Sequence, residues 1–106
     1  MKASLFFLLL ALTGAADAAA PAKSVAIALT KESFVPETAT VSTGAHIVWT
    51  NNDSVPHSVT ANDGRFDSGP VLPGKTFEWT ASGSGDVAYH CIYHPSMTAT
   101  LKIKGK

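Results

Sequence analysis

Apolar and polar residues alternate with a period of two along most of the chain, which is the pattern of strands that bury one face. Within residues 24–30, for example, Val25, Ile27 and Leu29 alternate with smaller side chains. After residue 20, no segment keeps a helical apolar period for three turns. The strands that the pattern predicts span residues 24–30, 38–42, 46–50, 58–61, 76–80, 87–91 and 98–103.

Turn-forming residues separate these segments. Pro36 limits residues 34–36 to an edge strand or a bend, because proline has no N–H to donate to a sheet. Residues 66–74 are too rich in Pro and Gly for regular structure and are expected to form a loop. Strands this short, with turns at this spacing, predict an all-β sandwich or barrel.

The first residues predict a secretory signal peptide. Met1 and Lys2 precede an apolar run at 5–12 and a small-residue stretch at 14–20, and the apolar run is too short to span a bilayer. We expect cleavage after Ala18, with Ala20 as the alternative, so that residues 19–106 form a single domain exported to the periplasm. A buried N-terminal helix is disfavoured, because nothing amphipathic follows and the stretch has no cap.

The formal net charge is zero at pH 7. No bulk charge therefore attracts nucleic acid or an anionic membrane surface. No later apolar run approaches the length of a membrane span. We expect the exported domain to be a soluble monomer.

Cys91 is the only cysteine and cannot form an internal disulfide. Small exported domains usually gain stability from paired cysteines, and an unpaired thiol in an oxidising compartment needs protection by burial or by a metal. One interpretation is a buried thiol that packs as a small apolar group. The alternative is a metal ligand.

The residues after Cys91 favour the metal. His94 follows three residues later and Met97 three residues after that, where a strand gives way to a tight loop that can turn several donors toward one point. His57, at the start of a strand beside the stiffening Pro56, is the best fourth candidate. Two imidazoles, a thiolate and a weak axial thioether are the ligands of blue-copper electron-transfer sites. Soft sulfur disfavours magnesium, calcium and manganese, and the Irving–Williams order favours copper over zinc. We therefore predict one copper ion bound by His57, Cys91, His94 and Met97.

The other two histidines are not expected to bind the metal. His90 neighbours Cys91 on a strand, so its side chain points to the opposite face. His46 alternates with Ile47 and Trp49, which need the core, and should face solvent.

Several short motifs resemble those of the cupredoxins. They are Phe34-x-Pro36, Val41-x-x-Gly44, Val48-Trp49-x-Asn51-x-Asp53, His57-x-Val59, Phe66-Asp67-Ser68-Gly69, Pro73-Gly74 and Tyr89-His90-Cys91-x-x-His94-Pro95-x-Met97. The resemblance covers about residues 25–103 and is closest to the amicyanin, pseudoazurin and plastocyanin group, with the Cys-x-x-His-x-x-Met loop most like amicyanin. It implies a Greek-key sandwich of about eight strands with copper near one end.

Four positions depart from that family pattern. Many relatives have Asn after the first ligand histidine and Ser or Thr after the cysteine, and these residues brace the ligand loops; this chain has Ser58 and Ile92. Val87 and Ala99 replace a common aromatic and a common glycine. No ligand is lost, but the surroundings that tune the reduction potential differ.

Electron carriage is the function that these features predict, because a complete protein ligand set leaves no open position for a substrate. Copper storage or delivery could use the same four ligands. An enzyme with Cys91 as nucleophile and His94 as base is disfavoured, because no Asn or Asp near them in the sequence would orient the base.

The resemblance also implies where electrons pass. His94 would lie near the surface, and a c-type cytochrome or a dehydrogenase would dock transiently over it. An apolar rim for such docking could come from Pro56, Pro70, Val71, Pro73 and Pro95. The alternative is that these prolines only shape loops.

Overall fold

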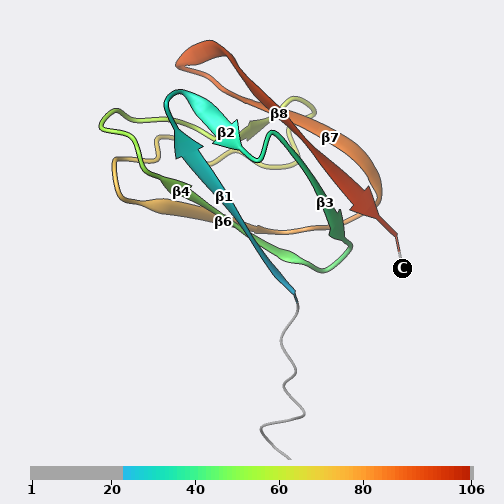
Figure 1. The fold of residues 1–106 in the computed structure, drawn as a ribbon. Coiled ribbons are helices and arrows are strands. Elements are labelled where there is room, and N and C mark those ends of the chain that lie inside the picture. Colours follow the sequence, from blue (N-terminus) through green and yellow to red (C-terminus); the bar gives the residue numbers. More distant parts are fainter. Residues whose placement is uncertain (1–22, 106) are drawn as a thin grey trace, which may run out of the picture.

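The computed structural model describes residues 23–105, which form eight strands in two four-stranded sheets packed face to face (Figure 1). The predicted signal peptide and its cleavage site lie outside these residues. None of the described residues belongs to a helix long and apolar enough to cross a membrane.

One sheet has the strand order β2-β1-β4-β6. Its strands are β1 (Ser24–Thr30), β2 (Ser33–Val35), β4 (His46–Asn51) and β6 (Thr76–Thr80). β1 runs parallel to β4, and the other two pairings are antiparallel. The short strand β2 lies at the edge, as Pro36 predicts.

The second sheet has the order β3-β8-β7-β5. Its strands are β3 (Thr38–Ser42), β5 (Thr60–Ala61), β7 (Gly85–Cys91) and β8 (His94–Lys104). The chain passes from one sheet to the other at each connection from β2 to β7. The predicted all-β sandwich of about eight strands is therefore confirmed.

An aromatic cluster fills the space between the sheets. Trp49 is fully buried, and its ring centroid lies 5.5 to 5.6 Å from those of Phe66, Phe77 and Tyr89. Its indole Nε1 donates a hydrogen bond of 3.2 Å to the Tyr89 hydroxyl, so the one polar atom of the ring is paired. Burial raises the pKa of Tyr89 to about 12, which keeps this phenol neutral.

Two strands differ from the prediction near the predicted ligands, whereas the bounds of β1, β3, β4, β6 and β7 agree to within two residues. The strand predicted at 58–61 is reduced to β5, because the backbone N–H groups of Ser58 and Val59 donate to the Cys91 sulfur and the Ser68 hydroxyl instead of to a strand. β8 begins at His94, four residues earlier than predicted. Both differences lie at the end of the sandwich where the predicted ligands gather.

Candidate metal centre

The β7–β8 hairpin places two of the predicted ligands. Cys91 pairs with His94 across a two-residue turn, whereas the preceding residue His90 pairs with Thr98. The three residues 95–97 therefore bulge out of the ladder. In a regular strand, residues three apart face opposite sides. The bulge breaks this alternation, so the loop expected between the ligands is present as an interruption inside β8.

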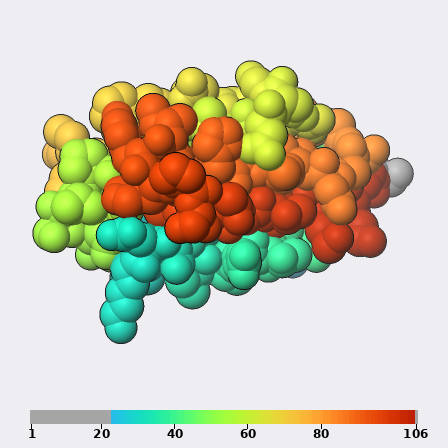
Figure 2. Space-filling model, turned by 90° about the horizontal axis from the view of Figure 1, so that it is seen from above, coloured from blue at the N-terminus to red at the C-terminus, as the bar shows by residue number. Residues whose placement is uncertain are grey.

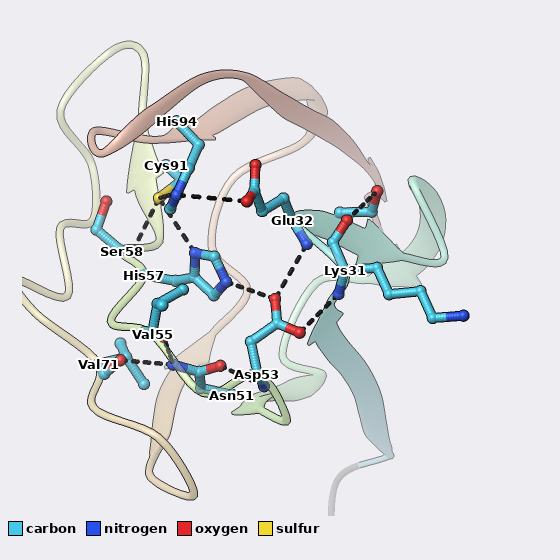
Figure 3. Close-up of polar contacts among 11 residues, drawn as sticks. Lys31, Glu32, Asn51, Asp53, Val55, His57, Ser58, Val71, Cys91 and His94 are labelled. Atoms are coloured by element: carbon cyan, nitrogen blue, oxygen red, sulfur yellow. Dashed lines mark hydrogen bonds and ion pairs between the residues drawn. The ribbon is translucent and has the colours of Figure 1, made fainter.

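Three donor atoms meet at this end of the sandwich. The Cys91 sulfur lies 3.7 Å from Nδ1 of His57 and 3.6 Å from Nδ1 of His94. The three donors all lie within 4.8 Å of one another, and no other such group of three or more occurs among the described residues (Figure 3). His57 and Cys91 are fully buried, whereas the His94 side chain is 25 % exposed.

Asp53 fixes the orientation of His57. Nε2 of the imidazole lies 2.7 Å from Oδ2 of Asp53, and a hydrogen bond donated to this carboxylate places the ring proton on Nε2. The lone pair of Nδ1 is then free and directed toward the Cys91 sulfur. A carboxylate in this position is a recurrent support for metal-binding histidines, because it sets both the tautomer and the ring plane.

The same carboxylate also accepts two backbone hydrogen bonds from the β1–β2 turn. The N–H groups of Lys31 and Glu32 donate to Asp53 at 2.7 and 3.0 Å. The bond from the Glu32 N–H, followed by that from His57, lowers the pKa of Asp53 from 3.8 to about 2. Asp53 is therefore ionised at neutral pH, and it ties the β1–β2 turn to His57.

Asn51 braces the loops beside His57. This fully buried side chain donates from Nδ2 to the carbonyl oxygens of Val55 and Val71, both at 2.8 Å. Its Oδ1 accepts the N–H of Asp53 at 2.8 Å. These three hydrogen bonds hold the segment 53–57 beside Val71 (Figure 3).

Ser58 joins the segments that carry His57 and Cys91. Its hydroxyl accepts the Ile92 N–H at 2.9 Å, and its own N–H donates to the Cys91 sulfur at 3.3 Å. Position 58 departs from the residue common in the family, but the hydroxyl still connects the two ligand loops. The N–H donor also stabilises negative charge on the sulfur, as a thiolate ligand needs.

The spacing of the three donors fits a small metal ion. With bonds of about 2.0 Å to nitrogen and about 2.3 Å to sulfur, an ion in a planar trigonal site holds N and S about 3.7 Å apart, and a tetrahedral ion about 3.5 Å apart. The observed distances are 3.6 and 3.7 Å. Two imidazoles and one thiolate in a trigonal arrangement are the equatorial ligands of type 1 copper.

Met97 is buried after the bulge, with 1 % of its surface exposed. It forms one wall of a cavity of about 100 Å³ that the β2 residues Ser33 and Phe34 and the acidic Glu32 and Glu37 also line. A thioether is the kind of weak axial donor that this trigonal set lacks.

The remaining histidines lie away from the cluster. Nδ1 of His90 lies 2.6 Å from Oδ1 of Asn62, and Nε2 of His46 lies 2.8 Å from Oε1 of Glu78. Each ring is partly exposed and has its own partner.

The apolar rim differs in part from the prediction. The four prolines are exposed, but Val71 is 4 % exposed because its backbone pairs with His57 and its side chain turns inward. The prediction for Val71 was therefore wrong. The large exposed apolar residues at this end are Val55, Leu72, Ile92 and Tyr93, with 40 to 54 % of their surface accessible.

Comparison with known proteins agrees with this picture. A model of the cupredoxin-like domain matches residues 2–103. Amicyanin-alpha of Methylorubrum extorquens is 28 % identical over 90 residues, which are 80 % of this chain and 76 % of the relative.

Two solved structures share the fold. A purple cupredoxin from Nitrosopumilus maritimus superposes with a TM-score of 0.68 at 24 % identity, covering 76 % of this chain and 99 % of its own. The Cu(I) form of an amicyanin mutant superposes with a TM-score of 0.72 at 18 % identity, covering 82 % and 88 %. With its eight-stranded sandwich, its cluster of His57, Cys91 and His94 donors and the family match over nearly its whole length, this chain belongs to the cupredoxin-like family.

Proposed function

We propose that the protein is a blue-copper electron carrier in which His57, Cys91, His94 and Met97 bind one copper ion. The observation that carries this proposal is the nearly equal spacing of the Cys91 sulfur from the two imidazole nitrogens, at 3.7 and 3.6 Å. Copper in such a site changes by one electron between Cu(I) and Cu(II). The chain contributes a donor set that the surrounding hydrogen bonds hold in place.

Rigid donors suit electron transfer because little has to move when the charge changes. His57 is fixed by Asp53, the loop around it by Asn51, and Cys91 by the N–H of Ser58. His94 differs from these, because its side chain is 25 % exposed to solvent. Among the described residues, no carboxylate or backbone group forms a hydrogen bond with its ring. The route for the electron that this arrangement favours is the His94 ring.

The exposed apolar residues support a transient redox partner. Val55, Leu72, Ile92 and Tyr93 belong to the loops that carry or adjoin the ligands, and they leave apolar surface accessible near His94. Small contacts of this type suit short-lived encounters. We propose a c-type cytochrome or a dehydrogenase as the partner and the periplasm as the compartment, on the basis of the signal peptide predicted at residues 1–18. Enzymatic chemistry at Cys91 is disfavoured because its thiol is fully buried.

The visible spectrum tests the copper assignment. Wild-type protein loaded with copper(II) should develop an intense blue colour from sulfur-to-copper charge transfer, and Cys91→Ser should lose it. Cys91→Ser should remain folded, because a buried thiol contributes only modest packing. A folded wild-type protein whose copper complex is colourless would contradict the assignment.

Kinetics separates electron carriage from copper storage or delivery. An electron carrier should exchange electrons with a cytochrome on mixing and should retain its copper when incubated with a metal-free acceptor protein. Release of copper to the acceptor without electron exchange would instead support delivery.

A further inference from the structure

An acidic side chain stands over the exposed edge of His94. Oε2 of Glu32 lies 3.9 Å from Nε2 of His94, the ring nitrogen opposite the one that faces Cys91. The Glu32 side chain is 62 % exposed. In Figure 3, Glu32 points toward His94, whereas the side chain of its neighbour Lys31 extends away from the cluster.

The backbone holds Glu32 in this position. Lys31 and Glu32 form the two-residue β1–β2 turn, and both have positive φ angles, 53° and 55°. Residues with side chains rarely adopt this conformation, because the β-carbon crowds the backbone. The two hydrogen bonds to the Asp53 carboxylate offset this cost. The same carboxylate orients His57, so the turn and the donor cluster share one support.

A second carboxylate adds to the charge of this face. Glu37 lines the cavity beside Met97 together with Glu32, and the other lining residues, Ser33, Phe34, Ser96 and Thr98, are neutral. Figure 2 shows the β1–β2 turn in cyan beside the orange-red β7–β8 turn on this end of the molecule. The chain as a whole is formally neutral, so negative charge near His94 is a local feature.

We propose that Glu32 makes the centre of the His94 face negative and selects a partner that presents a lysine or arginine there. The apolar side chains of Val55, Ile92 and Tyr93 would surround this charge contact. Charges placed in this way steer the encounter and fix its orientation more than they raise affinity. The description of that partner as a redox protein rests on the proposed function, but the charge preference does not.

Redox-inert probes test the charge preference directly. Hexaamminechromium(III) and hexacyanochromate(III) are paramagnetic ions of opposite charge, and each broadens the amide NMR signals of the residues it approaches. In both metal-free and copper(I)-loaded protein at low ionic strength, the cation should broaden the signals of Glu32, Tyr93 and Ser96 more than the anion does. Glu32→Gln should reduce the broadening by the cation about three- to tenfold, and salt should weaken the effect.

The matched control is Asp86→Asn, which removes the same charge at the start of β7, where Asp86 pairs with Lys102 at 3.2 Å. Glu32→Gln keeps the backbone N–H that binds Asp53, so the turn should persist. The control should leave the signals around His94 unchanged. Equal effects of the two substitutions, or equal broadening by the two ions in the wild type, would overturn the proposal.

Electron exchange gives a second measurement. For the copper protein, Glu32→Gln should slow the reaction with hexaammineruthenium ions and speed the reaction with hexacyanoferrate ions, again by about three- to tenfold at low ionic strength. A wild-type protein that reacts with neither reagent contradicts the electron-carrier function, whereas the NMR result still decides the role of Glu32. Reaction with both reagents at rates that Glu32→Gln leaves unchanged would count against Glu32 alone.

Discussion

Replacement of Asp53 by Asn tests whether one carboxylate stabilises both the β1–β2 turn and His57. Asp53 accepts hydrogen bonds from the N–H groups of Lys31 and Glu32 and from Nε2 of His57. An asparagine has one acceptor oxygen in place of two, carries no charge, and directs an NH₂ group toward some of these donors. The substitution therefore weakens all three contacts while it keeps the size of the side chain.

The magnitude follows from the pKa of Asp53, which the folded protein lowers from 3.8 to about 2. A shift of this size corresponds to about 2 kcal/mol of folding stability when the carboxyl is ionised. Because the pKa is lower in the folded state than in the unfolded state, this stability is present in full above about pH 4. It decreases as the pH falls toward 2, where the folded protein also takes up the proton.

Urea unfolding of the metal-free protein at pH values from 6 to 2 measures this contribution. Asp53→Asn should lower the free energy of unfolding by about 2 kcal/mol at pH 6, and the difference from wild type should shrink toward zero near pH 2. Asp86→Asn, which removes an exposed carboxylate paired with Lys102, should cost less than about 1 kcal/mol. The reasoning is refuted if the Asp53→Asn protein is as stable as wild type at pH 6, or if its deficit does not change with pH.

Substitutions at three further positions examine other parts of the site. Ser58→Ala removes the acceptor of the Ile92 N–H and should lower the free energy of unfolding by about 1–2 kcal/mol in a urea titration. Ser58→Thr keeps a hydroxyl group and should lose less of this stability. Met97→Gln should lower the reduction potential measured by redox titration while copper stays bound, because an oxygen donor favours copper(II); an unchanged potential would mean that Met97 is not a ligand. Lys31→Asn should raise the thermal midpoint, with a gain of about 0.5 kcal/mol, because asparagine adopts positive φ angles more readily; a lower midpoint would show that the turn conformation is not the limiting feature.

Most of the fold could be predicted from the sequence because its strands bury one face. Val25, Ile27 and Leu29 alternate with smaller residues, and β1 has the predicted bounds. Near the donors the pattern fails for a physical reason. Ser58 and Val59 are consecutive residues, and both are buried. Their N–H groups donate hydrogen bonds to the Cys91 sulfur and the Ser68 hydroxyl. The alternation of apolar and polar residues cannot show that backbone N–H groups bind a sulfur or a hydroxyl instead of a neighbouring strand.

The candidate ligands could be predicted because Cys91, His94 and Met97 are close together in the sequence. Their supports could not, because Asp53 lies 22 residues from Lys31 and 21 from Glu32. Asn51 ends β4, and Asp53 lies in the bend that follows it. Their role appears only when the fold brings the β1–β2 turn beside them. Lys31 and Glu32 also lack the Asn-Gly signal that usually marks such a turn.

The arrangement of supports separates two properties of the site that substitutions should affect independently. Glu32 contributes its side-chain charge to the face over His94, but only its backbone N–H contacts Asp53. A change at Glu32 should therefore alter the charge of the face without altering the orientation of His57. A change at Asp53 releases both the turn that places Glu32 and the imidazole of His57, so it should alter both. The Ser58 side chain touches neither the turn nor the Asp53 carboxylate. Ser58→Ala keeps the backbone N–H that donates to the Cys91 sulfur but removes the acceptor of the Ile92 N–H, so it should loosen the turn after Cys91 while leaving the charge preference intact. If instead Glu32→Gln changed the metal-site spectrum as much as Asp53→Asn, the side chain of Glu32 would belong to the support of the metal and not to the docking face.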